Sequence, residues 1–294
     1  MQGLILVNKP SGITSFKAVS KIKYLCATKR VGHTGTLDPM ATGVLPVFIG
    51  RATVLSNFLL ESDKRYIAEI TLGISTDTAD ITGNVINRQE VNVTKEQIEA
   101  VLKTFVGKQM QLPPMYSAIK KDGVRLYTLA RQGVEVEREA REIEIHSIDL
   151  VSDFKDNKFS IDVSCSKGTY IRSLCTDIGE KLGVCATLSS LQRTKTAQFC
   201  IENCVDLDVL TKENVSQYII SEEAALMHFK EVNITSKQAT RFSNGGQLDL
   251  DRLKIENISD HELLRVRYND TFLGLGSVNL EKNQLDIKCL VNIL

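Results

Sequence analysis

A glycine-rich segment, residues 32–43, constrains the fold of this chain more than any other part of its sequence. It reads Gly-His-Thr-Gly-Thr-Leu-Asp-Pro-Met-Ala-Thr-Gly. Its glycines permit positive φ angles and close approach of the backbone, and Pro39 favours an extended conformation at Asp38. Asp38 is therefore either a carboxylate presented by an irregular loop or the N-cap of a helix that has Pro39 at its first position.

The length and composition indicate an ordinary globular protein. The 294 residues, 43% of them hydrophobic, allow one large domain with an ample core and a second, smaller one. We find no run of eighteen apolar residues and no basic leader before the short apolar stretch at the start. We therefore expect a cytoplasmic protein without a membrane partner.

The seven cysteines predict neither a disulfide framework nor a metal site. Their number is odd, no Cys-x-x-Cys pair occurs, and only four histidines are available as further ligands. The acidic, hydroxyl-rich stretch 75–80 suggests calcium, but it lacks the glycine and the terminal glutamate of an EF-hand loop. We expect no metal ion.

The net charge of zero hides an uneven distribution. Residues 1–66 carry nine Lys or Arg against three carboxylates, and this is the part of the chain that contains Asp38. The excess predicts either a surface that contacts phosphates or the solvated face of a helix over residues 15–28, and the two can coexist.

Hydrophobic periodicity predicts a mixed α and β chain. We expect strands at 3–8, 65–73, 143–151 and 157–166, helices at 15–28 and 170–182, and a further helix that Thr94 caps. Tyr66 lies on the apolar face of its strand. Arg172 falls in the first turn of its helix beside the buried face, so it requires a carboxylate partner.

Two other regions are less regular. Residues 112–142 interleave basic side chains with Tyr116 and Tyr127, which indicates either contacts to RNA or a solvated hairpin. After about residue 205 the chain becomes polar, and short strands at 263–268, 271–279 and 285–290 follow a glycine turn. These strands predict a small β-rich unit.

The segment at 32–43 closely resembles the catalytic loop of the tRNA pseudouridine-55 synthases. The resemblance extends to Lys9-Pro10-Ser11-Gly12, Lys64-Arg65-Tyr66, Pro114-Met115-Tyr116-Ser117-Ala118 and Cys165-Ser166-Lys167-Gly168-Thr169-Tyr170-Ile171-Arg172, which occur in the order of that family. Four such segments in order are far more specific than one. The resemblance is strong over residues 3–200 and weak beyond them.

The resemblance implies an α+β protein with two domains. Residues 1–228 would form a catalytic domain of the pseudouridine-synthase type with a mixed, largely antiparallel sheet, and about 112–142 would be the inserted loop that clamps the RNA. Residues 229–294 would form a small β-rich, PUA-like RNA-binding domain. The inserted loop favours the bacterial, stand-alone type of the family, so we expect a monomer without an obligate protein partner.

The resemblance also implies a function, the conversion of uridine 55 in the T-loop of tRNA to pseudouridine without a cofactor. The base would be flipped into a pocket, cleaved from its ribose at N1 and re-joined through C5. Asp38, Tyr66 and Arg172 would be catalytic, and the substrate would be bound by His33, Leu191, Lys9 and Thr36. Whether Asp38 attacks C1′, adds to the base or removes a ribose proton stays open, and Lys9 has either a structural or a phosphate-binding role.

Three other functions are weighed against this one. One is a homologous enzyme that a guide RNA directs to ribosomal RNA within a larger assembly. The insertion at 112–142 favours the stand-alone type instead. A non-catalytic RNA-binding protein would be expected to have lost Asp38, Tyr66 or Arg172. A retaining glycosidase would need a second catalytic carboxylate, for which no comparable motif is present.

Overall fold

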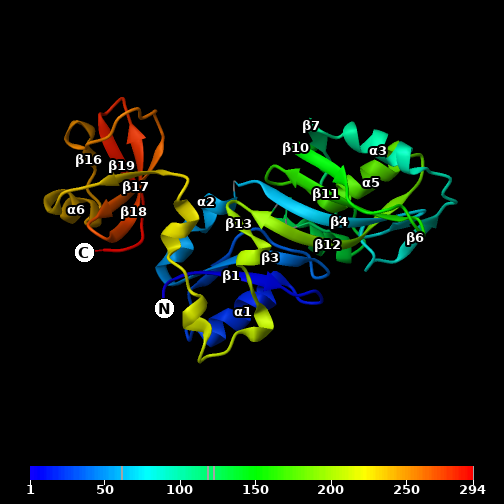
Figure 1. Cartoon of the computed structure of the whole chain (residues 1–294), viewed down its shortest axis with the longest axis horizontal. Coiled ribbons are helices and arrows are strands. Elements are labelled where there is room, and N and C mark those ends of the chain that lie inside the picture. The colour runs from blue at the N-terminus through cyan, green and yellow to red at the C-terminus, as the bar shows by residue number, and fades with distance from the viewer. Residues whose placement is uncertain (61, 118, 122, 294) are drawn as a thin grey trace.

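The chain is arranged around two β-sheets (Figure 1). The computed structural model describes residues 1–60, 62–117, 119–121 and 123–293, and it does not describe the side chains of Lys120, Arg125 and Arg131. Ala118, the last residue of the Pro-Met-Tyr-Ser-Ala motif, lies outside the described residues, as do those three side chains of the predicted RNA-contacting segment.

Within these ranges the larger sheet has ten strands and is mostly antiparallel. Its strands are β1 (Gly3–Lys9), β2 (Val31–His33), β3 (Thr42–Ile49), β4 (Lys64–Leu72), β7 (Gly107–Gln111), β10 (Arg141–Leu150), β11 (Lys158–Cys165), β12 (Ala186–Thr196), β13 (Phe199–Cys200) and β14 (Val205–Asp206). The order along the sheet is β14-β1-β3-β12-β4-β11-β10-β7, with β2 paired to β3 and β13 to β12. The β3–β12 and β1–β14 pairs are parallel. This sheet brings the loop before β3 close to the middle strands β4 and β12.

Helices and short hairpins connect the strands of the larger sheet. They are α1 (Ser15–Leu25), η1 (Gly50–Leu55), α2 (Ser56–Leu60), β5 (Ile74–Thr76), β6 (Val85–Arg88), α3 (Lys95–Lys103), β8 (Lys120–Lys121), β9 (Val124–Arg125), α4 (Leu126–Arg131) and α5 (Ile171–Lys181). A polar segment then continues through η2 (Ile201–Asn203), η3 (Leu207–Val209), η4 (Val215–Tyr218) and η5 (Glu222–Leu226). Helices α3 and α5 pack with β4, β10, β11 and β12 in one hydrophobic core.

The second sheet has five strands in the order β15-β17-β18-β19-β16 and lies at one end of the molecule, close to α2 (Figure 1). Its elements are β15 (Lys230–Asn233), α6 (Ser236–Ser243), β16 (Leu248–Asp249), η6 (Leu250–Arg252), β17 (Leu263–Tyr268), β18 (Thr271–Asn279) and β19 (Gln284–Leu290). It has a core of its own, but Phe272, Leu275 and Val291 also pack in a cluster with Leu4 and Phe48 of the larger sheet. The two parts are therefore joined by a continuous apolar contact.

Local signals account for most of these elements. Thr94 caps α3 in a complete capping box, and Gly183 follows α5 with φ +77°. Along β4 every second side chain from Lys64 to Ile70 is buried, as the alternation predicts. The expected strands and helices are confirmed, except that the helix expected at 15–28 is shorter. Helix α1 ends at Leu25, and two residues later the backbone of Ala27 takes a positive φ, which a helix cannot continue through.

Candidate active site

A cleft of about 330 Å³ lies where the 32–43 loop meets β4, β12 and the start of α5. Its lining residues are Gly35, Thr36, Leu37, Asp38, Leu60, Lys64, Tyr66, Tyr116, Ser117, Ser166, Gly168, Thr169, Tyr170, Ile171, Arg172, Leu191 and Arg193. Each of the segments that carry the family resemblance after Lys9-Pro10-Ser11-Gly12 contributes to this lining. Its volume falls within the range of about 300–1,000 Å³ that is typical of small-molecule sites.

Lys9 binds the backbone of the loop that carries Asp38. The side chain of Lys9 is fully buried, and its ammonium donates to the carbonyls of Pro10 (2.7 Å), Ile13 (2.8 Å) and Pro39 (3.3 Å). Burial lowers the pKa of Lys9 to about 8. Lys9 does not line the cleft, and these bonds favour the structural one of the two roles that the sequence left open.

Asp38 itself is not a helix cap. It lies in an irregular segment followed by a turn, in which the Ala41 N–H donates to the Asp38 carbonyl at 3.1 Å, and the chain then enters β3. Ser15, at the start of α1, holds the neighbouring Leu37 by bonds to its N–H and carbonyl. The carboxylate is thus free of the backbone role that the alternative interpretation gave it.

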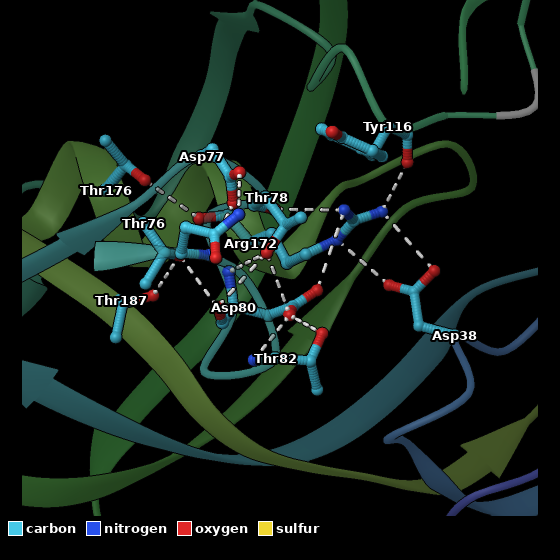
Figure 2. A network of polar contacts seen from close by, with 11 residues as sticks. Asp38, Thr76, Asp77, Thr78, Asp80, Thr82, Tyr116, Arg172, Thr176 and Thr187 are labelled. Carbon is cyan, nitrogen blue, oxygen red and sulfur yellow. Dashed lines mark hydrogen bonds and ion pairs between the residues drawn. The ribbon is translucent and has the colours of Figure 1, made fainter. Parts of the chain in front are cut away.

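Arg172 holds the Asp38 carboxylate in a two-point contact (Figure 2). Arg172 Nε lies 2.9 Å from one carboxylate oxygen, and Nη2 lies 3.3 Å from the other. The same guanidinium donates to the carbonyls of Tyr116 (2.7 Å) and Thr78 (3.1 Å), and Nη1 lies 3.8 Å from Asp80. Only 6% of the Arg172 side chain is exposed, so its charge is matched inside the protein by these groups.

Asp80 belongs to the turn between β5 and β6, and it has a structural task. Its carboxylate accepts from the Thr82 N–H at 3.0 Å, from the Thr82 hydroxyl at 2.5 Å and from the Thr78 hydroxyl at 3.0 Å. The acidic stretch 75–80 therefore folds into a hydroxyl-bonded turn that fixes the carbonyl of Thr78 against Arg172. Within the described ranges no three potential metal ligands are grouped.

The electrostatic environment of Asp38 is mixed. Burial raises the pKa of its carboxyl above the ordinary value, Arg172 and Lys9 act to lower it, and Asp80 acts to raise it. The carboxylate is consequently more basic than an exposed aspartate while it remains oriented by the guanidinium.

Tyr66 and Leu191 form a second wall of the cleft. Tyr66 is 9% exposed and Leu191 is 6% exposed, on the adjacent strands β4 and β12. Burial raises the pKa of the Tyr66 phenol, and Arg193, directly opposite on β12, acts to lower it. The fully buried Arg193 also donates to the carbonyls of Val44 (2.8 Å) and Gly35 (2.9 Å). It thereby connects Tyr66 to the loop that carries Asp38.

The structure brings five of the seven predicted site residues to the cleft. These are Asp38, Thr36, Tyr66, Arg172 and Leu191. Neither Lys9 nor His33 belongs to the lining. His33 ends β2, burial lowers its pKa, and its Nδ1 is buried without a hydrogen-bond partner among the described residues.

Sequence reasoning did not assign a role to several residues that the cleft contains. Arg193 stands two positions after Leu191, and this spacing places both side chains on the same face of β12. Lys64 donates to the carbonyls of Leu60 (2.8 Å) and Ser62, and burial lowers its pKa to about 8. The detectable signal was the position of Arg193 two residues after the apolar Leu191, because an arginine on the apolar face of a strand requires partners.

Comparisons with known proteins agree with one another. The family model for the N-terminal domain of TruB family pseudouridylate synthases matches residues 23–171, and the tRNA pseudouridylate synthase B C-terminal domain matches residues 172–229. The tRNA pseudouridine synthase B of Clostridium tetani is 44% identical over 298 residues, which cover 99% of this chain and 100% of that protein. That of Fusobacterium nucleatum is 44% identical and covers 97% of this chain and 98% of its own length.

Solved structures show the same relationship. The chain is similar to a protein in a Cbf5-Nop10-Gar1 complex, with 27% identity, a TM-score of 0.77, and coverage of 99% of this chain and 85% of that one. A chain of an H/ACA RNP bound to a substrate RNA containing 2′-deoxyuridine gives 25% identity, a TM-score of 0.75 and the same coverage.

The expected fold class, a mixed-sheet catalytic part followed by a β-rich part, is confirmed. No helix in the described part is long and apolar enough to cross a membrane. The sequence relatives and the family models together establish that this chain belongs to the TruB family of pseudouridylate synthases.

Proposed function

We propose that this protein converts uridine 55 in the T-loop of tRNA into pseudouridine. The relatives that match it over nearly their whole length are tRNA pseudouridine synthases. The single structural observation that carries the proposal is the Asp38 carboxylate, held on one edge by Arg172, in a cleft whose walls include Tyr66 and Leu191. A carboxylate with a fixed orientation and an apolar wall suits a reaction on a nucleoside.

The proposed reaction is an isomerisation and leaves the composition of the RNA unchanged. The N1–C1′ bond breaks, the base turns while it remains bound, and C5 forms the new bond to C1′. The proton of C5 is lost, and N1 gains one. No electrons enter or leave, so the chemistry requires no redox cofactor.

In this proposal Asp38 supplies the reactive oxygen. Its pKa is raised by burial, which makes the ionised form a stronger base and nucleophile than an ordinary aspartate. Arg172 is in contact with both carboxylate oxygens, so it fixes the direction in which the carboxylate faces the substrate. The bonds from Arg172 to the carbonyls of Thr78 and Tyr116 keep the guanidinium in place.

The other predicted residues would receive the flipped base. Tyr66 would stack on it and, as the phenolate that the charge of Arg193 favours, take the proton from C5, and Leu191 would form an apolar wall. Thr36 is exposed at the cleft and is suited to contact the RNA there. His33 would lie against the RNA at the position that the base vacates, while Lys9 would act through the loop that it holds.

We further propose that residues 1–228 and 229–294 are two domains of an enzyme that acts as a monomer without an obligate protein partner. Separate sheets and a separate apolar core of the second part support the division. Phe272, Leu275 and Val291 give the two domains a shared apolar interface. Size-exclusion chromatography with light scattering tests the monomer, and a chain that ends at residue 228 tests the division through its activity and cooperative melting.

The function is tested by incubating the pure protein with unmodified tRNA and mapping pseudouridine by sequencing after chemical adduct formation. We expect one product, at the T-loop uridine. A tRNA with cytidine at that position is the matched control and should remain unmodified. Product at other sites alone, or none at all with a well-folded protein, would contradict the proposal.

A further inference from the structure

The ammonium of Lys64 has one donor that the protein does not use. Lys64 lines the cleft, and its ammonium donates to the carbonyls of Leu60 at 2.8 Å and of Ser62. A lysine ammonium carries three N–H donors. Within the described residues the third has no acceptor, so it is available to a group that enters the cleft.

Lys9, the second buried lysine in the described part of the chain, differs in this respect. Its ammonium donates to three carbonyls, those of Pro10, Ile13 and Pro39, and it does not line the cleft. Burial lowers the pKa of both lysines to about 8, so both have lost much of their water. All the donors of Lys9 are therefore used by the protein, whereas Lys64 keeps one for a ligand.

The surroundings of Lys64 do not supply a negative charge in contact with it. The adjacent carboxylate, Asp63, has a side chain that is 64% exposed and lies 3.3 Å from His146 Nε2. The thiol of Cys165, opposite Lys64 on β11, stays neutral because burial raises its pKa to about 11. Arg193, a like charge, acts with burial to lower the pKa of Lys64. A buried cation without a carboxylate partner favours an anionic ligand over a neutral one.

The position of Lys64 on β4 indicates which part of a nucleotide reaches it. Lys64 and Tyr66 are two residues apart on the buried face of the strand, which corresponds to about 7 Å. The next residue on that face, Ala68, is fully buried in the core. A base that stacks on Tyr66 consequently has its sugar and phosphates on the Lys64 side, since the other direction is closed.

We infer that Lys64 binds a phosphate oxygen of the RNA backbone beside the uridine that enters the cleft. This inference rests on the proposed function. Phosphates are the anionic groups of unmodified RNA at neutral pH, and lysine binds them as a point charge. The contact supplies the third acceptor of the ammonium and compensates a buried charge that carbonyls alone compensate only in part.

The contact predicts a change in the salt dependence of binding. Lys64→Met keeps most of the length of the side chain but removes its charge. The slope of the logarithm of affinity against the logarithm of salt concentration should become less steep by about 0.7, the contribution of one phosphate contact on a single strand. Lys158→Met is the matched control, because Lys158 lies at the other end of the β4–β11 pair and is half exposed. It should leave the slope unchanged.

A neutral methylphosphonate in the RNA tests the same contact from the side of the substrate. T stem-loops carry it at the linkage on the 5′ or the 3′ side of the target uridine. The preceding ribose is 2′-O-methylated in each of them and in its phosphate control, which protects the linkage from cleavage. One of the two substitutions should weaken binding to the wild type by about ten-fold, as expected for a hydrogen bond to a charged group. The same substitution should have little effect on Lys64→Met.

Filter binding of the full-length proteins to these stem-loops at several salt concentrations measures both effects, and melting curves check folding. If Lys64→Met folds poorly, Lys64→Gln removes the charge and keeps a donor. Weaker binding with an unchanged salt slope would identify a neutral partner, such as a carbonyl of the base, and would overturn the inference. It would equally be overturned if neither methylphosphonate weakened binding to the wild type. Activity of the wild type on unmodified tRNA is assayed in parallel, so that failure of the proposed function is recognised separately.

Discussion

Among the described residues, Arg172 with Asp38 and Arg265 with Glu223 form two arginine–carboxylate networks with buried arginines, and of these two the first faces the cleft. In the cleft, Arg172 contacts Asp38, whose side chain is 33% exposed. Where the second sheet meets the rest of the chain, Glu223 contacts Arg265 and Arg267, each at 2.8 Å, and its side chain is only 10% exposed. The interactions have the same chemical type, but their surroundings differ.

The two networks differ in whether the carboxylate can reach a substrate. Each oxygen of Glu223 faces its own arginine, and Arg265 also donates to the carbonyl of Phe229, so this network is closed on itself. Asp38 is held by a single arginine along one edge, and its other side borders the cleft. We expect loss of the closed network to affect stability and loss of the open one to affect turnover.

The largest expected effect is that of Asp38→Asn on turnover. Asparagine keeps the size of aspartate but removes the charge and the nucleophilic oxygen, so the rate should fall by more than about 1,000-fold while tRNA affinity stays nearly intact. Single-turnover assays with saturating enzyme, beside filter binding, measure both quantities. Glu223→Gln is the matched control and should retain most of the turnover. Near-normal turnover of Asp38→Asn would refute the catalytic assignment.

Replacing the arginine of each network sharpens the comparison. Arg172→Lys keeps the charge but loses the planar contact with both oxygens of Asp38, and turnover should fall by about 100-fold. Arg265→Lys should leave turnover close to that of the wild type and lower the melting temperature. Equal effects of the two substitutions on the single-turnover rate would contradict the distinction.

Loss of the Glu223 network should lower the free energy of unfolding more than loss of an exposed ion pair. Glu223→Ala leaves Arg265 buried without its main carboxylate, which is expected to cost about 3–5 kcal/mol of unfolding free energy. Glu69→Ala, which removes an exposed ion pair with Lys158, should cost less than about 1 kcal/mol. Urea denaturation compares the variants. A similar small loss for both would show that the interface pair is not important for folding.

The smallest expected effect concerns pH. Because Asp38 must be ionised and its pKa is raised, the rate should increase with pH along a limb that lies above the ordinary titration of aspartate. Asp80→Asn removes a like charge and should shift this limb to lower pH. Single-turnover rates from about pH 4 to about pH 8 test this. Glu223→Gln should leave the limb in place, and an unmoved limb in Asp80→Asn would argue against the coupling.

The sequence alone determined the elements whose signals are local. The capping box at Thr94, the alternation along β4 and the three C-terminal strands were all predictable, because propensity and periodicity act over a few residues. The Asp38 loop was found for the same reason. Its resemblance to a known family then indicated the function, which no periodicity could do.

Only the tertiary structure decided what each side chain contacts. Local sequence left Asp38 as either a cap or a presented carboxylate, and the absence of a helix after it, within the described residues, resolved this choice. It likewise could not show that the turn at Asp80 supports Arg172, which is 92 positions away. Such contacts depend on how distant strands come together in the sheet, and that arrangement is set by the packing of the whole core rather than by any one segment.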